Sequence, residues 1–560
     1  MNRARLTPRD PAADLNRPMT HEERRVVLAS SMGTVFEWYD FYVYGSLAAV
    51  IARHFFSGLN PTAGFIFALL TFAAGFAVRP FGALVFGRLG DLVGRKYAFV
   101  VTILIMGLST FLVGVLPSFS SIGTAAPMIL LGLRLLQGLA LGGEYGGAAV
   151  YVAEHAPNHR RGFFTSWIQT TATTGMFLSL VVVLGTRVTL GSEAFESWGW
   201  RVPFLISVLL LVISVWIRLR LHESPAFTRM KSEGLLSRAP IKEAFGRWRN
   251  LRLILIALIG LTAGQAVVWY TGQFYALYFL TETLGVDANI ANILVALALM
   301  LACPFFLVFG ALSDRIGRKP IIMAGCLIAI LTYFPTFKGL THFANPALER
   351  AHARAPVYVV ADPSNCSLQF NPVGITAFTS SCDLLKSFMA DHSVHYVNRP
   401  APAGTTAYAL IGNQRVDAFE GSRLSRAEFA RRDRTLQAQL QDAVRVHGYP
   451  DHADPTQINY VMVLALLFFL VLQVTMVYGP IAALLVEMFP TRIRYTSMSV
   501  PYHIGNGWFG GFLPPVAFAT VATTGNIYDG LWYPIIVCAM TLVVGLLFVK
   551  ETPHQDLNAI

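Results

Sequence analysis

Charged residues are scarce in this sequence. Asp, Glu, Lys and Arg make up 13% of the 560 residues, whereas 54% are hydrophobic, and the mean hydropathy is +0.53. A water-soluble protein with a single core is excluded, because so much apolar surface could not be buried within it. The charges lie between about twelve apolar stretches of roughly 20 residues, the length that a helix needs to cross a bilayer. The sequence therefore predicts an all-α membrane protein.

Cysteine is also scarce, with five residues in the chain. This number is too small for a disulfide-stabilised scaffold. Cys303, Cys326 and Cys538 lie in apolar segments, where free cysteine commonly fills a hydrophobic core. Cys366 and Cys382 lie in a long polar segment that the predicted topology places outside the cytoplasm, where disulfides persist. The sequence leaves open whether these two are bonded.

Motifs of other protein classes are absent as well. There is no Walker phosphate-binding loop, which excludes ATP as the energy source. The net charge of +11 is not arranged as a basic stripe with interleaved aromatic residues, so we expect no nucleic-acid partner. We expect no enzymatic activity, no cofactor and no metal site, because no metal or nucleophile spacing joins the histidines of the long polar segment: His352, His392, His395, His447 and His452.

The apolar stretches form two sets of six predicted helices. Basic residues cluster in alternate connections, at 88–96, 160–161, 218–252, 315–319 and 492–494, and the positive-inside rule places these and both termini in the cytoplasm. The amino-terminal tail lacks the residue order of a cleaved signal. The predicted parts are a cytoplasmic tail (1–27), a six-helix half (28–220), a cytoplasmic linker (221–250), helices 7–9 (251–337), an extracytoplasmic insert (338–458), helices 10–12 (459–549) and a cytoplasmic tail (550–560).

An internal repeat supports two homologous halves. Gly-Arg-Leu-Gly-Asp-Leu-Val-Gly-Arg-Lys at 87–96 recurs as Gly-Ala-Leu-Ser-Asp-Arg-Ile-Gly-Arg-Lys at 310–319, and each copy follows the second helix of its half. A second pair of similar segments, at 144–157 and 477–490, is offset by about 110 residues more than the first. The extra residues place an insert between helices 9 and 10. Its polar composition predicts a small subdomain that is partly ordered at best.

The repeated Gly-x-x-x-Asp-x-x-Gly-Arg-Lys motif resembles the signature of the major facilitator superfamily. Six further motifs resemble its metabolite:proton symporter family, and they lie at 36–45, 79–82, 134–138, 143–147, 198–204 and 487–495. The resemblance covers the chain except the amino-terminal tail and the insert. It implies twelve transmembrane helices in two six-helix halves. It also implies uptake of a metabolite such as proline, betaine, shikimate, 2-oxoglutarate or citrate.

Ionisable side chains within the helices of the first half are the candidates for proton coupling. Glu37 and Asp40 lie one helical turn apart, and Arg79 and Glu144 are predicted at a similar depth, so four charges share one layer. Each charge inside a membrane costs about 3 kcal/mol or more unless it is paired or hydrated. Their presence indicates either proton coupling or a buried ion-pair cluster that fixes helix packing.

Arg134 lies near the predicted midplane and shares a helix face with Gln137. The pair predicts a site for a substrate carboxylate or, alternatively, a permanent salt bridge. The corresponding positions of the second half are apolar, so proton coupling is assigned mainly to the first half. Polar residues of the second half, His503 among them, could complete a cavity by hydrogen bonding, but we expect His503 to be a core residue and not a proton carrier. The other predicted substrate-binding residues are Tyr44, Gln169, Gln265, Gln273 and Asn506.

The repeated loops lie too near the cytoplasm to contact a central substrate. The resemblance implies that they latch the two halves together there, with each Asp facing a helix amino terminus and the Arg facing an acid at the end of helix 4. The residues of this predicted cytoplasmic gate are Asp91, Arg95, Glu154, Asp314 and Arg318. The basic residues also act as topology determinants, but that role does not explain the repeated Asp and Gly.

The residues and the resemblance together predict a proton-coupled secondary transporter that imports an organic carboxylate or zwitterion by alternating access. The expected partners are a small-molecule substrate, the proton and membrane lipid, and we expect a monomer in a bacterial inner membrane. The alternatives are a proton-coupled drug or metabolite efflux antiporter, an uncoupled facilitator, and a membrane-anchored sensor or enzyme that acts through the insert. Arg79 and Arg134 disfavour the export of cationic drugs, because like charges repel.

Overall fold

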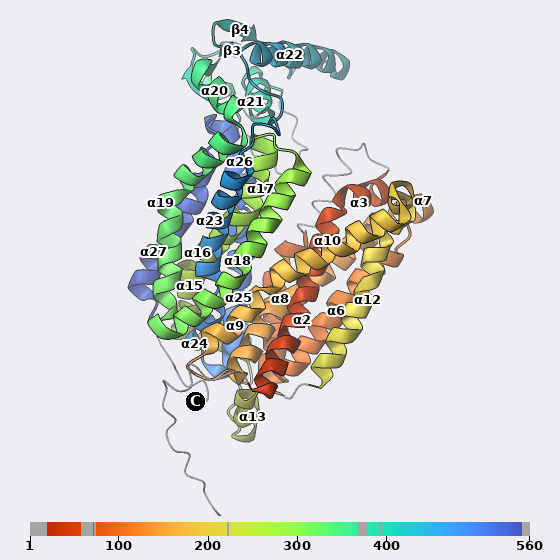
Figure 1. The fold of residues 1–560 in the computed structure, drawn as a ribbon, viewed down its shortest axis with the longest axis vertical. Helices are drawn as coiled ribbons and strands as arrows, with labels where there is room; N and C mark the ends of the chain where they lie inside the picture. Colours follow the sequence, from red (N-terminus) through yellow and green to blue (C-terminus); the bar gives the residue numbers. More distant parts are fainter. Residues whose placement is uncertain are drawn as a thin grey trace, which may run out of the picture.

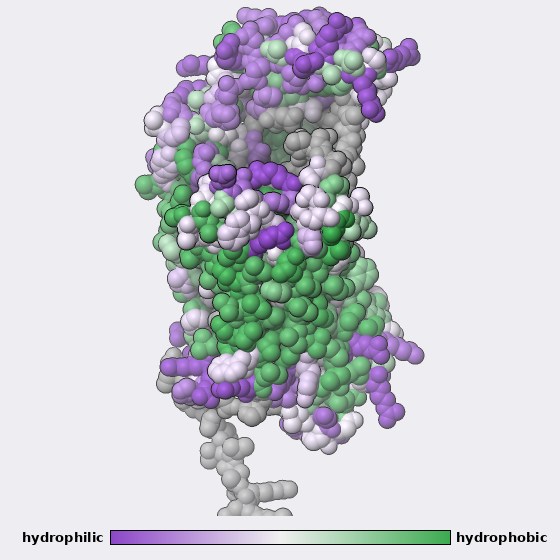
Figure 2. Space-filling model, turned by 90° about the vertical axis from the view of Figure 1, so that its right-hand side faces the viewer, coloured by the Kyte–Doolittle hydropathy of each residue, from purple (hydrophilic) through white to green (hydrophobic). Residues whose placement is uncertain are grey.

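Helices dominate the structure, a computed structural model that describes residues 20–57, 71, 74–220, 223–367, 379–392 and 394–551. Within this described part, nine helical stretches are long and apolar enough to cross a membrane. On the face shown in Figure 2, apolar side chains form a belt between two polar ends. A belt of this kind matches the hydrocarbon layer of a bilayer, where apolar side chains face lipid.

The first half consists of helices that pack around α8. Helix α6 packs against α8 and α12, α5 packs against α8, and α2 packs against α10. Part of the predicted second helix, before residue 74, lies outside the described residues. The helices of this half are α2 (His21–Ser46), α3 (Ala48–Phe55), α5 (Arg79–Leu92), α6 (Arg95–Val115), α7 (Phe119–Ile122), α8 (Ala125–His155), α9 (Arg161–Gln169), α10 (Thr171–Leu190), α11 (Ser192–Ala194) and α12 (Arg201–Leu219).

The second half follows two short linking helices, α13 (Pro225–Ser232) and α14 (Pro240–Gly246). A helical stretch from Trp248 to Thr283 contains three π-helical turns. The helices of this half are α15 (Trp248–Ala257), α16 (Ala263–Tyr270), α17 (Ala276–Tyr278), α18 (Ala288–Ile316), α19 (Arg318–Ala344), α23 (Tyr460–Tyr478), α24 (Ile481–Met488), α25 (Arg494–Ile504), α26 (Leu513–Thr524) and α27 (Trp532–Phe548).

The two halves contact each other chiefly through α5 against α25 and α9 against α18. Their ribbons converge at the end that carries the α5–α6 and α18–α19 turns, and separate toward the opposite end (Figure 1). We call the end that carries the α5–α6 and α18–α19 turns the basic end. Small residues allow the close approach. A Cβ atom added at Gly90 would lie 2.1 Å from the Tyr495 ring, and one at Gly162 would lie 2.5 Å from the Gly310 carbonyl.

The segment between α19 and α23 forms a subdomain outside the bundle, at the end opposite the basic end (Figure 1). Its four-stranded sheet has the order β2-β1-β3-β4, with β1 parallel to β2 and antiparallel to β3. The carboxylate of Asp362 accepts hydrogen bonds from Gly404 and Ser364, which lower its pKa. The elements are α20 (Pro346–Arg354), β1 (Val357–Ala361), α21 (Ser381–Asp391), β2 (Tyr396–Pro400), β3 (Tyr408–Ile411), β4 (Gln414–Asp417) and α22 (Arg426–Val446).

This subdomain differs from the prediction in two respects. A segment that was expected to be partly ordered at best holds a sheet, because short runs such as Val357–Ala361 are too short to cross a membrane but suit a buried strand. Helix α19 also continues past its predicted end at 337 to Ala344. Lys338 and His342 are exposed and do not break the helix, which stops just before Pro346.

The described hydrogen bonds from this subdomain to the bundle end on the second half. The backbone amide of Tyr396 donates to the Gly525 carbonyl after α26 at 3.0 Å, and that of Ala453 donates to Gly285 before α18 at 2.9 Å. The side chain of Asn398 donates to the carbonyl oxygens of Thr523 and Thr524. The subdomain is therefore anchored on the connections at the ends of α26 and α18.

A disulfide joins Cys366 to Cys382 across a sequence separation of 16 residues. Closing a loop of this size stabilises a fold by about 3 kcal/mol in the chain-entropy model. We therefore expect a variant with Cys366→Ser and Cys382→Ser to be digested faster by trypsin within the subdomain, while the bundle stays intact. Cys303→Ser serves as the control. Alkylation of both Cys366 and Cys382 in the unreduced protein would contradict the bond.

Candidate functional site

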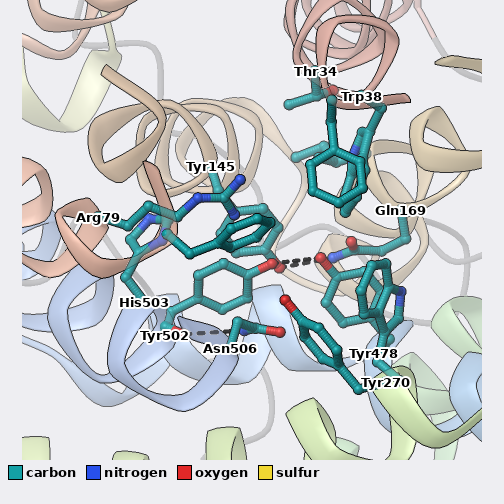
Figure 3. A pocket seen from close by; sticks show the side chains of 14 residues that line it. Thr34, Trp38, Arg79, Tyr145, Gln169, Tyr270, Tyr478, Tyr502, His503 and Asn506 are labelled. Carbon is teal, nitrogen blue, oxygen red and sulfur yellow. Dashed lines mark hydrogen bonds between the residues drawn. The ribbon is translucent and has the colours of Figure 1, made fainter. Parts of the chain in front are cut away.

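A narrow cavity lies between the two halves, and most of its lining is aromatic (Figure 3). Arg79 is the one formally charged side chain among the described residues that line it. The first half contributes Thr34, Trp38, Phe41, Phe76, Arg79, Tyr145, Ile168 and Gln169, and the second half contributes Trp269, Tyr270, Tyr478, Tyr502, His503 and Asn506. Both halves therefore form the site, as an alternating-access transporter requires.

Arg79 is the first residue of α5, and its guanidinium lies over the Phe76 ring at 4.2 Å from the ring centre. Its Nε atom is buried without a hydrogen-bond partner. In the described part of the chain, no ion pair joins Arg79 to Asp40 or Glu144. Arg79, Asp40 and Glu144 of the predicted four-charge layer therefore do not form one cluster. The side chain of the fourth residue, Glu37, lies outside the described residues.

Asp40 forms a buried cluster with Arg134 and Gln137. Arg134 lies 3.5 Å from the Asp40 carboxylate and donates to the Gln137 amide oxygen at 2.6 Å. Gln137 in turn donates to Asp40 at 3.4 Å and to the Thr110 hydroxyl at 2.9 Å. The Arg134 guanidinium also lies 4.1 Å from the centre of the Tyr44 ring. Arg134 has a carboxylate partner within the protein, and its binding of substrate stays a prediction.

Glu144 is held by Arg218, which the sequence analysis counted in the basic cluster 218–252 at the end of the six-helix half. Helix α12 includes Arg218, and its side chain is buried within the bundle and does not enter the loop. Arg218 donates to Glu144 at 2.5 Å and to the Phe99 carbonyl at 2.8 Å. The Thr102 hydroxyl donates to the other carboxylate oxygen at 2.9 Å. The sequence did carry a signal for this pair, because an acid on a membrane helix requires a basic partner.

The predicted polar residues of the cavity fall into two groups. Gln169 lines the cavity and donates to the Tyr145 hydroxyl at 2.8 Å, and Asn506 lines it from a π-helical segment, Gly505–Gly510. Gln265 lies behind Asn506 and exchanges hydrogen bonds with it at 3.3 and 3.2 Å. Tyr44 and Gln273 are buried and are not among the described lining residues.

Aromatic residues of the cavity were missed by the sequence analysis. The rings of Tyr145 and Tyr502 stack across the interface between the halves with their centres 3.7 Å apart, and Tyr502 contacts the hydroxyl of Tyr478. Trp38 and Trp269 also meet across this interface, with ring centres 5.3 Å apart. Aromatic residues in apolar helices give no sequence signal for a cavity, because the same residues fill lipid-facing and core positions.

The first half supplies one charge network at the basic end. Asp91 accepts hydrogen bonds from first-turn amides of α25 at 3.3 and 3.0 Å, where the positive end of the helix dipole favours a carboxylate. Arg95 lies 3.4 Å from Asp91 and 3.7 Å from Glu154, which also pairs with Arg494 at 3.0 Å. These contacts connect α5 and α8 to α25 of the other half.

A second network repeats this arrangement with the halves exchanged. Asp314 accepts hydrogen bonds from two first-turn amides of α9, each at 2.8 Å. Arg318 lies 3.0 Å from Asp314 and 3.1 Å from Glu487, and Arg161 lies 3.3 Å from Glu487. Both copies therefore place the Asp at a helix amino terminus of the other half and the Arg beside a glutamate. The sequence analysis missed Glu487, although it occupies the repeat position of Glu154.

Two further carboxylates at the basic end complete the repeat. Glu223 follows α12 and accepts from the backbone amides of Arg95 and Lys96, at 3.1 and 3.2 Å, where α6 begins. Glu551 follows α27 and accepts from the amides that begin α19, each at 2.8 Å. Glu-Ser-Pro at 223–225 and Glu-Thr-Pro at 551–553 were the overlooked sequence signal.

The two helical halves, the apolar belt and the interfacial cavity define a multi-pass membrane transporter. The chain belongs to the sugar (and other) transporter family of the major facilitator superfamily, which it matches over residues 26–347 and 445–560. The stretch between these ranges lies within the subdomain described above. The relatives are membrane transporters and not enzymes.

Two bacterial transporters illustrate the relationship. The proline/betaine transporter of Salmonella typhimurium is 37% identical over 56% of this chain and 64% of its own length. The shikimate transporter of Escherichia coli is 38% identical over 57% of this chain and 72% of its own length. Among solved structures, the proton:xylose symporter XylE bound to 6-bromo-6-deoxy-D-glucose has a TM-score of 0.60 at 15% identity, covering 96% of this chain and 98% of XylE. This structural likeness shows the fold.

The two networks predict that Glu487 stabilises the closed basic end. Glu487→Gln weakens the ion pair with Arg161, which joins the two halves and is worth about 1.5 to 3 kcal/mol, so we expect the open population to rise roughly tenfold or more. A reporter at Ser166→Cys, buried near Gly310 of α18, should then react faster with a maleimide, as measured by peptide mass spectrometry. Glu233→Gln, at an exposed ion pair, is the control. Equal labelling rates in the two variants would contradict the prediction.

Proposed function

We propose that this chain imports a small polar metabolite together with protons by alternating access. The observation that carries the proposal is a polar, aromatic cavity between two halves whose contacts close the basic end through ion pairs and hydrogen bonds. Such contacts can break and reform in each transport cycle, whereas the helices within each half are packed together. The relatives include transporters for proline and betaine and for shikimate, which supports a metabolite as the substrate.

The basic end faces the cytoplasm in this proposal. Lys and Arg are concentrated in its connections, and the positive-inside rule retains such connections in the cytoplasm. The subdomain between α19 and α23 is then extracytoplasmic, where the disulfide between Cys366 and Cys382 is stable. The closed basic end therefore corresponds to a state that receives substrate from outside.

Asp40 is the carboxylate that we assign to proton coupling. Its contacts to Arg134 and Gln137 are long, at 3.5 and 3.4 Å, so Arg134 can separate from it when the proton binds. Glu144 instead accepts at 2.5 and 2.9 Å from Arg218 and Thr102. The tighter contacts suit a permanent structural ion pair, which stays closed during the cycle.

Purified protein in proteoliposomes tests the proposed function. An inward proton gradient should drive accumulation of a radiolabelled carboxylate or betaine from a metabolite panel, and a collapsed gradient should abolish the accumulation. Substrate movement against the direction of proton flow would instead identify an efflux antiporter. Equal flux with and without the gradient would identify an uncoupled facilitator.

Asp40→Asn should reduce gradient-driven accumulation at least tenfold while substrate exchange across the membrane continues. The amide cannot release a proton, yet it keeps the size and hydrogen-bonding capacity of the carboxylic acid. Accumulation and counterflow exchange are measured in the same vesicles, and the exposed Glu193→Gln is the control. Accumulation at the level of the unmodified protein would remove Asp40 from the coupling mechanism.

Glu144→Gln should act mainly on stability. Removal of the carboxylate leaves the Arg218 charge buried without its acid, and breaking a buried ion pair destabilises a protein by about 3 to 5 kcal/mol. We expect a lower melting temperature for Glu144→Gln than for Asp40→Asn, with residual coupling in the folded fraction. A stable Glu144→Gln protein that cannot couple would reverse the two assignments.

A further inference from the structure

The cavity has buried polar atoms that lack hydrogen-bond partners among the described residues. Among the described residues, the Arg79 Nε, the Trp269 indole nitrogen and both ring nitrogens of His503 have no hydrogen-bond partner. Arg79, Trp269 and His503 all line the cavity, and the last two are 4% and 1% exposed. Unpaired buried donors are unfavourable, so an acceptor group from a ligand would stabilise this arrangement.

Arg79 and His503 lie on the same side of the cavity, although they come from different halves (Figure 3). Arg79 is the first residue of α5 and His503 belongs to α25. A group bound between Arg79 and His503 would therefore contact α5 and α25 at once, and would connect the two halves.

The charges of the cavity limit the ligand to one negative group. Arg134 and Arg218 are neutralised by Asp40 and Glu144, so of these three arginines Arg79 is the one without a carboxylate partner among the described residues. A single guanidinium compensates one carboxylate well, since its donors match two carboxylate oxygens. A second carboxylate would face aromatic rings, whose negative faces repel anions.

We propose that the substrate is a small monocarboxylate, with its carboxylate held by Arg79 and His503 and its body against Tyr145 and Tyr502. Tyr145 and Tyr502 line the same cavity as Arg79 and His503, and their rings stack on each other. His503 sets specificity by donating one N–H to the carboxylate, while Arg79 supplies the charge. This inference rests on the proposed transport function and specifies its substrate class.

Binding to the full-length protein in detergent tests the substrate class independently of proton coupling. Thermal shift and tryptophan fluorescence are measured with three matched series: benzoate, phthalate and trimesate; cyclohexanecarboxylate and its di- and tricarboxylate; and butyrate, succinate and tricarballylate. The strongest ligand of the panel should be a monocarboxylate, and its neutral amide should not bind. A panel without any binding carboxylate, or a strongest ligand with two or three carboxylates, would overturn the proposal.

Variants of the two donors test the assignment of the site. Arg79→Gln should weaken binding of the strongest monocarboxylate roughly ten- to a hundredfold, because a charge-assisted hydrogen bond is lost. His503→Leu should weaken it about tenfold, whereas His503→Gln, which keeps a donor, should remain within about threefold of the parent. Arg187→Gln and His342→Leu, at exposed positions, are the matched controls.

Melting temperatures without ligand separate folding from recognition. A folded His503→Leu protein with unchanged affinity would remove His503 from the site, and a folded Arg79→Gln protein with unchanged affinity would overturn the proposal. Normal monocarboxylate binding without gradient-driven uptake would contradict the proposed transport function and leave the substrate class supported. The two failures are therefore distinguishable.

Discussion

The pairing of charges within an apolar bundle is the constraint on which this structure depends. A charged side chain among membrane helices is costly, and the cost falls when an opposite charge or a helix end lies beside it. Arg134 meets Asp40, Arg218 meets Glu144, and Arg95 meets Asp91. Each pair connects different helices, so the same contacts that reduce the cost of the charges also fix which helices are neighbours.

Some of these ion pairs connect helices of one half, and others connect the two halves. The pairs of Asp40 and Glu144 lie within the first half, whereas Glu154 and Glu487 bind arginines from both halves. Contacts within a half can persist throughout a conformational cycle, but contacts between halves must break when the basic end opens. The position of an ion pair, and not its chemistry alone, therefore separates a structural role from a role in gating.

The subdomain between α19 and α23 adds a second kind of constraint. Its hydrogen bonds to Gly525 and Gly285 bind together the connections at the ends of α26 and α18. Because these contacts lie within the second half, they do not oppose a movement of that half relative to the first. The disulfide between Cys366 and Cys382 acts locally, inside the subdomain.

Hydropathy was enough to predict the helical membrane class, and the internal repeat predicted two halves with an insert in the second. Hydropathy and the repeated Asp-x-x-Gly-Arg-Lys motif are local patterns, so one sequence was sufficient to find them. The resemblance implied that Asp91 and Asp314 each face a helix amino terminus, but it did not name the helices. The small sheet was not predicted, because short polar-flanked strands carry a weak signal.

The tertiary structure decided the partners of the charges inside the bundle. Arg218 is more than 70 residues from Glu144 in sequence, and no local pattern indicates that they meet. The same holds for Arg79 and His503, which lie on different halves and come to one cavity. Side chains at similar depth share a layer, but only the rotation and packing of whole helices determine which of them touch, because each helix presents several faces to its neighbours.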